Sequence, residues 1–395
     1  NGHATQANVV VVEEGGAFFA PATALAAWRL RPADAPRSID GAAHHSLQAW
    51  QPQLQAQTQR LNLSVPADAF TGQVLNLNAT AAVQAAARDQ TPLGLALDYA
   101  LKLDRDQSAT RGSALLDLRA FGLSPMGSLR HSGLLNLGPL LPGDRRWRRL
   151  DTAWRQANPA HMGRTTVGDT VSCGGELAPT VRFAGVQMNT DFGLQPDAPP
   201  YPMPSVQGSA QVPSGVDLLV NGQPAGSINV GPGPFTLQTL PSLNGAGEIR
   251  LVQRDIQGVE QVRTVPYYNS PRLLRSGLSE HCVEAGLLRL DYGLNTDRYE
   301  GRFAAAAWRE GWSDTVTTSA RAASSDAVRS LHLGVHWVPA HLGVVTVQAA
   351  HSQARDGDSG HSLRLGVERV APGYHLSANF EHADDGFRQI DGQRP

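Results

Sequence analysis

Four stretches of the chain alternate apolar and polar residues with a period of two, which predicts β-strands. In the first stretch, Leu93–Leu103, every second residue is Leu or Tyr, and Gly, Ala, Asp or Lys stand between them. The same alternation returns at Leu331–Trp337, Leu363–Val367 and Tyr374–Phe380. Successive side chains of a strand point to opposite faces, so each of these strands has one apolar face. The first run covers eleven residues, which is about twice the usual length of a strand in a soluble protein.

The residues on the two faces favour a membrane β-barrel over a soluble β-sandwich. The apolar face carries Leu, Val, Tyr and Trp, with aromatic residues near the strand ends, and the other face carries charges and histidines beside Gly and Ala. This combination is typical of strands that have lipid outside, water inside and aromatic residues at the membrane interfaces. A soluble sheet gives a similar alternation, so the pattern alone leaves both architectures open. No stretch reaches the roughly 18 consecutive apolar residues that a transmembrane helix needs.

The first segment, from Asn1 to about Ala69, has a different pattern and predicts a small α+β domain. Val9–Val12 is an apolar β-branched run that Glu13–Gly16 ends, Ala22–Trp28 reads as one or two helical turns, and Leu61–Pro66 alternates until the proline ends it. A polar, alanine-rich stretch follows and predicts a linker.

A second compact segment, about Gln195 to Asn269, interrupts the run of long strands. It opens with five prolines and continues with short apolar runs separated by turn residues. Val216–Val220 leads into Asn221-Gly222, the strongest short-range signal for a β-hairpin. We therefore expect a small β-sandwich inserted between strands of a larger sheet.

Composition excludes several classes of function. The chain has 395 residues, 41% of them hydrophobic and 17% charged, with a net charge of −2, so it lacks the basic surface of a nucleic-acid-binding protein. The sequence contains no phosphate-binding GxxxxGK[ST] loop and no Gly-x-Ser-x-Gly elbow. It begins at Asn1 without a basic, then apolar, leader, so a signal peptide is absent or already removed.

Several polar groups suggest chemistry, but a simpler interpretation is favoured for each. His332 and His336 share one strand face and form a conceivable metal pair, but two polar residues facing the water-filled interior explain them better. Adjacent His44 and His45 fit a solvated loop. The Asp356–Gly360 stretch lacks the later Glu of an EF-hand calcium loop and fits a hairpin turn. Four acidic residues could be posed as glycosidase pairs, but charged loops explain them: Glu310 with Asp314, and Glu280 with Glu284.

The basic run Arg145–Arg149, interrupted only by Trp147, has two interpretations that the sequence leaves open. In a barrel it would contact outer-leaflet lipopolysaccharide or face an inserted domain.

The inserted segment also carries a family resemblance. The turn Gly231–Leu237, the stretch Asn244–Ile249 and the closing stretch Val265–Gly277 resemble the plug domain of fimbrial outer-membrane ushers. Val167–Asp169 and Phe183–Asp191 resemble the two strands before that plug, and Glu284–Gly286 with Asp291–Gly293 resembles the strand after it. The resemblance designates these plug-motif residues: Gly208, Asn221, Gly222, Gly231, Pro232, Gly233, Pro234, Phe235, Pro266, Tyr267 and Tyr268.

The resemblance implies the fold and function of the chaperone–usher pathway. The expected fold is all-β: a transmembrane antiparallel barrel of the 24-strand type, with an inserted plug sandwich and a partial α+β N-terminal domain. The expected protein sits in the outer membrane with its N-terminal domain in the periplasm. It accepts chaperone–pilin complexes and secretes the pilus subunits through the plugged pore. Its partners would be these complexes, the pilins and the lipid bilayer, with no nucleic acid.

The resemblance also sets the expected domains and implies that the chain is a piece of a longer protein. About six strands precede the plug and six or seven follow it, roughly half of such a barrel, and the C-terminal domains of ushers are missing. The expected divisions are an N-terminal domain at 1–70, a linker at 71–92, six barrel strands at 93–194, the plug at 195–275 and further strands at 276–395.

The two cysteines, Cys173 and Cys282, have no metal-ligand spacing. With the N-terminus in the periplasm, up-and-down strands would place Cys173 near an external turn and Cys282 near the periplasmic start of a later strand. We therefore expect them not to pair, and a non-reducing mass measurement that finds two hydrogens missing would contradict this.

Three functions are compared. An usher is favoured and needs no catalytic residues, cofactor or metal, because donor-strand exchange belongs to the subunits and the chaperone. Another porin-like barrel, or a receptor with a plug, is disfavoured because plugged receptors carry the plug at the N-terminus. A secreted soluble sandwich that binds or cleaves carbohydrate would need polar outward faces at Leu93–Leu103 and Tyr374–Phe380, which the sequence does not have.

Overall fold

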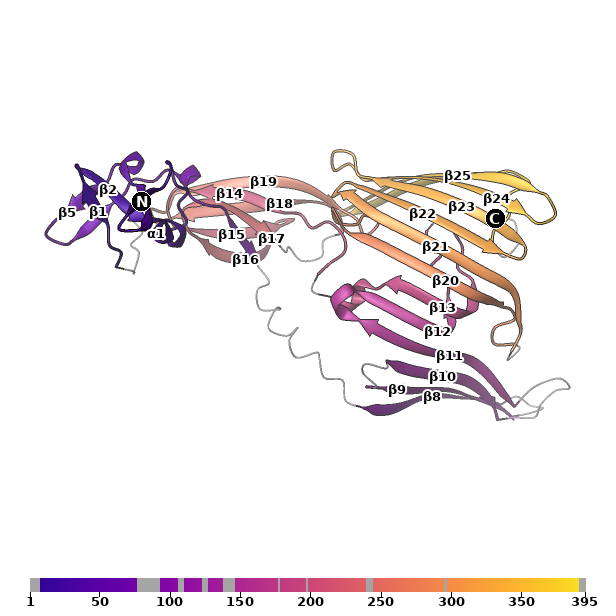
Figure 1. Cartoon of the computed structure of the whole chain (residues 1–395). Coiled ribbons are helices and arrows are strands. Elements are labelled where there is room, and N and C mark those ends of the chain that lie inside the picture. The colour runs from indigo at the N-terminus through magenta and orange to yellow at the C-terminus, as the bar shows by residue number, and fades with distance from the viewer. Residues whose placement is uncertain are drawn as a thin grey trace. The chain divides into compact units, whose positions relative to one another are not determined.

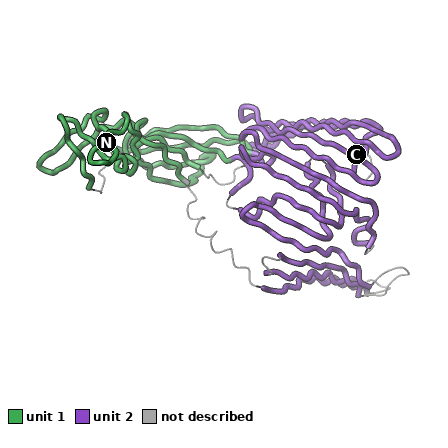
Figure 2. The backbone as a smooth tube through the Cα atoms, in the orientation of Figure 1, with its two compact units in different colours: residues 1–79, 203–269 green, residues 80–202, 270–395 purple. Residues whose placement is uncertain are grey.

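A computed structural model describes residues 8–76, 93–105, 110–122, 127–137, 146–176, 178–196, 198–238, 244–294 and 297–390. The chain divides into two compact units (Figure 2). Unit 1 comprises residues 1–79 and 203–269, and unit 2 comprises residues 80–202 and 270–395. In the part of the chain that the structure describes, no helix is both long and apolar enough to cross a membrane.

Unit 1 begins with a small α+β domain. Its sheet has the order β1-β2-β4-β3, and the apolar residues Ala20, Leu25, Leu47 and Trp50 fill its core. Helix α1 follows Pro21, whose fixed extended backbone suits the position before a helix. The elements are β1 (Val12–Glu14), β2 (Ala17–Pro21), α1 (Ala22–Ala27), β3 (Arg37–Ile39), β4 (Ala42–Ser46), η1 (Gln48–Trp50), β5 (Gln53–Gln55), β6 (Arg60–Asn62) and η2 (Ala67–Ala69).

One prediction for this domain needs correction. His44 and His45 do not lie in a solvated loop: both are buried in β4. Each finds a polar partner, since the ring of His44 contacts the carbonyl oxygen of Ala42 and that of His45 contacts Asp34. The first strand, β1, begins at Val12, the last residue of the apolar β-branched run, and Val12 pairs with Phe19 of β2.

The second part of unit 1 is a β-sandwich of two sheets, with strand orders β14-β17-β7 and β16-β15-β18-β19. Apolar side chains fill the space between the sheets, as the short apolar runs predict. Four of them are fully buried: Val216, Phe235, Leu237 and Ile249. The hairpin predicted at Asn221-Gly222 joins β15 to β16. The strands are β7 (Gln73–Asn76), β14 (Val206–Ala210), β15 (Ser214–Val220), β16 (Gln223–Val230), β17 (Gly233–Gln238), β18 (Gly245–Asp255) and β19 (Glu260–Asn269).

Strand β7 comes from the segment that follows the α+β domain. It pairs in parallel with β17, with Phe235 opposite Gln73. Residues 73–76 of the predicted linker therefore form an edge strand of the sandwich, and residues 77–92 lie outside the described part.

Unit 2 is one large antiparallel sheet whose described residues form thirteen strands (Figure 1). The order is β26 (Tyr374–Ala383), β25 (Ser359–Ala371), β24 (Val344–Ala354), β23 (Val328–Trp337), β22 (Val316–Ser325), β21 (Tyr299–Ser313), β20 (Ser279–Arg289), β13 (Arg182–Thr190), β12 (Gly163–Val171), β11 (Trp147–Asn158), β10 (Ser128–Asn136), β9 (Thr110–Phe121) and β8 (Gly94–Arg105). Short helices η5 (Pro159–His161) and η6 (Phe192–Leu194) flank β12 and β13. Neighbours in the sheet are consecutive in the chain except β13 and β20, between which the sandwich is inserted.

The two faces of this sheet differ as the alternation predicts. One face, here the outer face, exposes apolar side chains along whole strands, such as Leu95 at 76% and Leu333 at 52%. The opposite, inner face holds His332, His336 and Arg321, all of them buried. A soluble protein buries the apolar face of a sheet and exposes the polar one, whereas this sheet does the reverse, which suits contact with lipid.

Segments that connect or follow the strands cover part of the inner face. Residues 172–176 and 178–181, which join β12 to β13, form an inner loop, and residues 384–390 form a tail after β26. The tail crosses several strands: the backbone N–H of Arg388 donates to Ser352, and the carbonyl of Ile390 accepts from Ser325. Ile390 packs with Phe183 and other apolar residues in a small core on this face.

The sheet is folded back at a row of glycines. Gly168, Gly185 and Gly286 lie opposite one another on β12, β13 and β20. Val171 pairs with Arg182, five residues from Gln187, yet the Gln187 side chain donates to the Val171 carbonyl oxygen at 2.8 Å. Five residues of a flat strand span about 16 Å, beyond the reach of that side chain. The β12–β13 ladder must therefore bend between these positions, where the glycines lie.

Candidate functional site

The plug-motif residues all lie in the sandwich, and they fall into two groups. One group is structural: Phe235 fills the core opposite Gly208 in the β14–β17 ladder. Asn221 and Gly222 form the β15–β16 turn, where the side-chain oxygen of Asn221 accepts a hydrogen bond from the backbone N–H of Glu248 at 3.0 Å. The Asn221 amide donates to the hydroxyl of Tyr267, whose pKa is raised by burial. Pro266 and Tyr268 flank Tyr267 on β19.

The second group, Gly231 to Pro234, is the turn into β17, and residues of the α+β domain and of β7 contact it. Arg29 donates to the carbonyl of Pro232 at 3.1 Å, and Gln73 donates to the carbonyl of Gly231 at 3.3 Å. At Gly233, φ is +109°, and an added Cβ would lie 2.5 Å from the Cβ of Phe70. This position tolerates only glycine, because both its backbone angle and its space exclude a side chain.

Contrary to the sequence-based expectation, Cys173 and Cys282 form a disulfide, with sulfurs 2.08 Å apart and Cα atoms 6.4 Å apart. The prediction followed the up-and-down course of the strands without any bend, and it put the two residues at opposite ends of the sheet. The bend at the glycine row turns the end of β12 back over the inner face. Cys173 is thereby carried to the early part of β20, where Cys282 lies.

A buried ion pair accompanies the disulfide. Glu284 lies on β20 two residues after Cys282, on the same face, and Arg321 lies on β22; both side chains are at most 1% exposed and are 3.1 Å apart. Glu284 also accepts from the backbone N–H of Cys173 and from Gln187, and Arg321 donates to the carbonyl of Cys173. The two contacts with the backbone of Cys173 hold the inner loop, and the shared bonding offsets the cost of burying two charges.

The tip of the inner loop reaches the segment that follows the sandwich. A Glu176 carboxylate oxygen lies 3.3 Å from the ring of His336 on β23 and another lies 3.6 Å from Arg272. Arg272 also pairs with Glu368 on β25 at 2.9 Å. The two histidines singled out in the sequence thus face the interior, as expected, and His336 contacts a carboxylate and Thr346.

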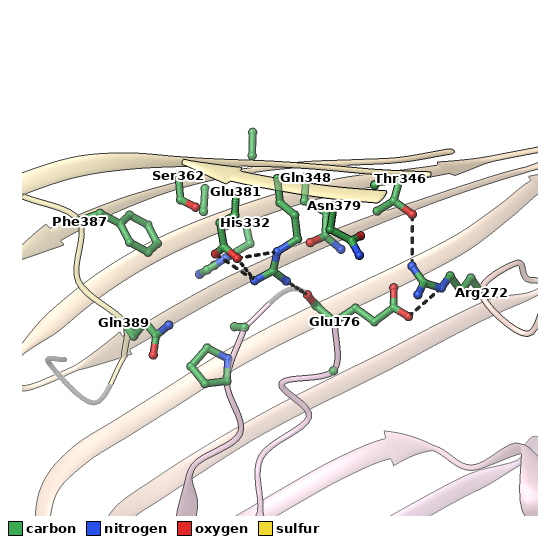
Figure 3. Close-up of a pocket in the computed structure, with 17 residues that line it drawn as sticks. Glu176, Arg272, His332, Thr346, Gln348, Ser362, Asn379, Glu381, Phe387 and Gln389 are labelled. Carbon is green, nitrogen blue, oxygen red and sulfur yellow. Dashed lines mark hydrogen bonds and ion pairs between the residues drawn. The ribbon is translucent and has the colours of Figure 1, made fainter. Parts of the chain in front are cut away.

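A cavity of about 500 Å³ opens between this loop, the tail and strands β23 to β26. Figure 3 shows its lining, which mixes polar and apolar residues: Glu176 and Arg272 lie on one side, Gln348, Asn379 and Glu381 on the sheet, and Phe387 and Gln389 come from the tail. Arg364 crosses the cavity floor, donating to Glu381 and to the backbone carbonyl of Glu176. The cavity is therefore a water-accessible recess of the inner face, crossed by ion pairs.

A second ionic cluster lies where β11, β12 and β20 approach one another. Arg289, 1% exposed, pairs with Asp151 and Asp169, and Tyr292 donates to Asp151 at 2.8 Å. Arg149, the last residue of the basic run, also binds Asp169. That arginine therefore serves this cluster, whereas Arg145 lies outside the described residues.

Three of the four carboxylates considered for glycosidase chemistry are engaged in other contacts. Glu280 pairs with Arg309 at 3.1 Å, Glu284 pairs with Arg321, and Asp314 accepts from the backbone N–H of Ser276. The stretch at Asp356 forms the turn between β24 and β25, as expected. Among the described residues, one group of three potential metal ligands lies close together, Cys173, Cys282 and Glu284, and there the two sulfurs are already bonded to each other.

Comparison with known proteins decides the family. The family model described as outer membrane usher protein matches residues 137–389, which is more than half of the chain. The chain belongs to the outer membrane usher family. This agrees with the resemblance that the motif around Gly231 carries, and with the interrupted antiparallel sheet.

Individual usher relatives are distant and considerably longer. Outer membrane usher protein FimD of Escherichia coli K12 is 24% identical over 263 residues, covering 62% of this chain and 29% of that protein. The F1 capsule-anchoring protein of Yersinia pestis is 25% identical over 233 residues, covering 58% and 28%. The chain thus spans under a third of the length of these curated relatives.

A solved structure has a similar fold. It is the E. coli P pilus tip assembly intermediate PapC-PapD-PapK-PapG, with a TM-score of 0.54, 17% identity and coverage of 87% of this chain and 43% of that chain. The partial all-β barrel fold expected from the sequence is therefore confirmed.

Proposed function

We propose that this chain is the plug-bearing portion of an outer-membrane usher, which accepts chaperone–pilin complexes and secretes pilus subunits through a gated β-barrel pore. In this proposal the thirteen-stranded sheet is part of the barrel wall, the outer face contacts lipid, and the inner face lines the pore. The partners are periplasmic chaperone–subunit complexes, pilins and the lipid bilayer, and the α+β domain lies in the periplasm.

One observation carries the proposal: a compact sandwich is inserted between β13 and β20, two strands that pair directly in the sheet. A domain inserted there is joined to the wall by two chain segments and can occupy the pore without interrupting the ladder. A wide barrel leaks unless its interior is filled, so a plug is the natural role of this insertion.

The surface of the sandwich suits a plug that must leave a hydrated pore. Polar side chains cover both of its sheets, and these are Gln207, Gln211, Asp217, Gln223, Asn229, Gln238 and Arg254. We infer that the plug-motif residues act by holding this domain together and by presenting the Gly231–Pro234 turn, and that they catalyse no reaction. Energy for secretion would come from subunit folding and strand exchange, so the usher itself needs no enzyme activity or cofactor.

The test is deletion of residues 205–269 from the full-length parent protein. Both forms are fractionated and reconstituted in planar bilayers. The intact protein should partition with the outer membrane and conduct little, and the deletion should give large, long-lived conductance steps. A soluble protein, or a deletion that leaves conductance unchanged, would overturn the proposal and return attention to a soluble glycan-binding sandwich.

A further inference from the structure

In the described sheet, one pair of neighbouring strands, β13 and β20, is not consecutive in the chain. We call this pair the seam. β13 ends at Thr190 and β20 begins at Ser279, and the sandwich occupies the chain between them. The other neighbouring strands of the described sheet follow each other in the chain. A tight hairpin turn fixes the register of a strand pair, and the β13–β20 pair, which is joined through a whole inserted domain, has no such restraint.

A disulfide and a side-chain hydrogen bond cross this seam. Cys173 lies in the inner loop that joins β12 to β13, and its disulfide reaches Cys282 on β20, with a sequence separation of 109 residues that spans β13 and the inserted segment. Glu284 of β20 accepts a hydrogen bond from Gln187 of β13, its ladder partner, at 2.9 Å. Arg321 extends the bonding to β22.

We propose that the Cys173–Cys282 disulfide is a redox-dependent staple of the wall, which keeps β13 and β20 paired while the sandwich moves. The proposal rests on the proposed function for the movement of the sandwich, but not for the bonding across the seam. The staple closes the one long loop in the sheet's connectivity, and closing a long loop restricts the unfolded and partly opened chain most. The ion pair then orders the inner loop around the staple.

The chemistry of the staple is thiol–disulfide exchange. The thiolate of one cysteine attacks an external disulfide oxidant and releases one thiol, and the second cysteine displaces the other. Two S–H bonds are lost and one S–S bond forms in the protein, while the oxidant becomes two thiols. A thiol reductant reverses the same steps.

Hydrogen exchange on the intact chain tests the staple. The folded protein in detergent micelles is compared before and after treatment with a phosphine reductant, and alkylation with mass analysis verifies that the bond is broken. We expect amides of Val186–Asn189 and Val283–Ala285 to exchange at least about tenfold faster after reduction. Val345–Gln348 in β24, in the same sheet, serves as the internal control and should be unchanged. Equal exchange at the seam in both states would overturn the proposal.

A variant covers the case in which the buried bond resists the reductant. C173S/C282S should show the fast seam exchange of the reduced protein under both conditions, and it should not respond to reductant. Slow seam exchange in this variant would show that the ion pair alone suffices and would overturn the staple.

Conductance separates the staple from the proposed function. In the full-length parent protein without residues 205–269, reduction should increase the current fluctuations of the open pore at least about twofold, and reduction of the matching C173S/C282S form should not. Absence of any conductance in either redox state would refute the pore function, while the exchange measurement would still decide the staple.

Discussion

Gly185 of β13 lies directly opposite Gly286 of β20, and neither position has room for a side chain. A Cβ on Gly185 would lie 2.0 Å from the carbonyl oxygen of Ala285, and a Cβ on Gly286 would lie 2.1 Å from that of Ala184. Both obstacles are backbone atoms, which cannot rotate away. The close approach of the two strands at the bend therefore depends on glycine on both sides.

We expect Gly185→Ala to lower the free energy of unfolding by about 1–3 kcal/mol, because the strands must separate to admit the methyl group. Urea titration in detergent micelles measures this. Gly163→Ala on β12 is the matched control, since the nearest atom to its Cβ is 4.0 Å away, and it should change stability by less than about 0.5 kcal/mol. Equal effects of the two substitutions would contradict the close approach at the bend.

The sandwich core offers a second prediction. Phe235 is 1% exposed between the two sheets, and Phe235→Ala should cost about 3–5 kcal/mol because it removes a buried ring and leaves a cavity. Limited proteolysis should cut the sandwich first in this variant and leave the large sheet intact. Val262→Ala on β19, where the side chain is 59% exposed, should resist protease like the unmodified protein.

The glycine at the start of β17 has two reasons to resist substitution. Gly233→Ala should destabilise unit 1 by more than about 1 kcal/mol, since the methyl group clashes with Phe70 and the residue must keep a positive φ. Thermal unfolding followed by circular dichroism measures the loss. Phe70→Gly removes the Cβ that the new methyl group meets, so the loss caused by Gly233→Ala, measured against Phe70→Gly alone, should be smaller in that background. An equal loss would show that backbone strain alone sets the cost.

The buried ion pair predicts a large effect from the loss of one partner. Arg321→Ala leaves the buried carboxylate of Glu284 without its opposite charge. Removing one member of such a pair lowers the free energy of unfolding by about 3–5 kcal/mol. Arg302→Ala is the control, because Arg302 is 85% exposed and its pair with Asp326 lies at the surface, where a pair contributes at most about 1 kcal/mol. Urea titration of both variants should separate them clearly.

Much of the large sheet could be predicted from the sequence because lipid-facing strands carry a strong period-two signal. The strands that contain Leu95 and Tyr374 can be predicted from their own alternation, without knowing which strands pair with them. The inserted sandwich was also visible, because Asn221-Gly222 and the prolines around it mark a change from long strands to short ones.

The bend and the disulfide could not be predicted in this way. Period-two alternation describes a flat strand, and it gives no sign that Gly168, Gly185 and Gly286 align across three strands. Without that bend, Cys173 and Cys282 are far apart. The one local clue was the spacing of Cys282 and Glu284, which puts a thiol and a carboxylate on the same inner face.

The outer face supplies the last prediction, which tests its contact with lipid. Leu333 stands midway along β23 and is 52% exposed; if this face meets hydrocarbon, Leu333→Arg should cost about 2–4 kcal/mol, because a charge near the bilayer midplane loses its hydration. Leu342→Arg is the control, since Leu342 is 64% exposed but lies in the turn between β23 and β24 and should change stability by less than about 1 kcal/mol. Urea titration of protein folded into lipid vesicles measures both, and the same pair in a short-chain detergent should lose most of its difference. A soluble sheet would accept arginine equally at both positions, because water would solvate the charge in either place.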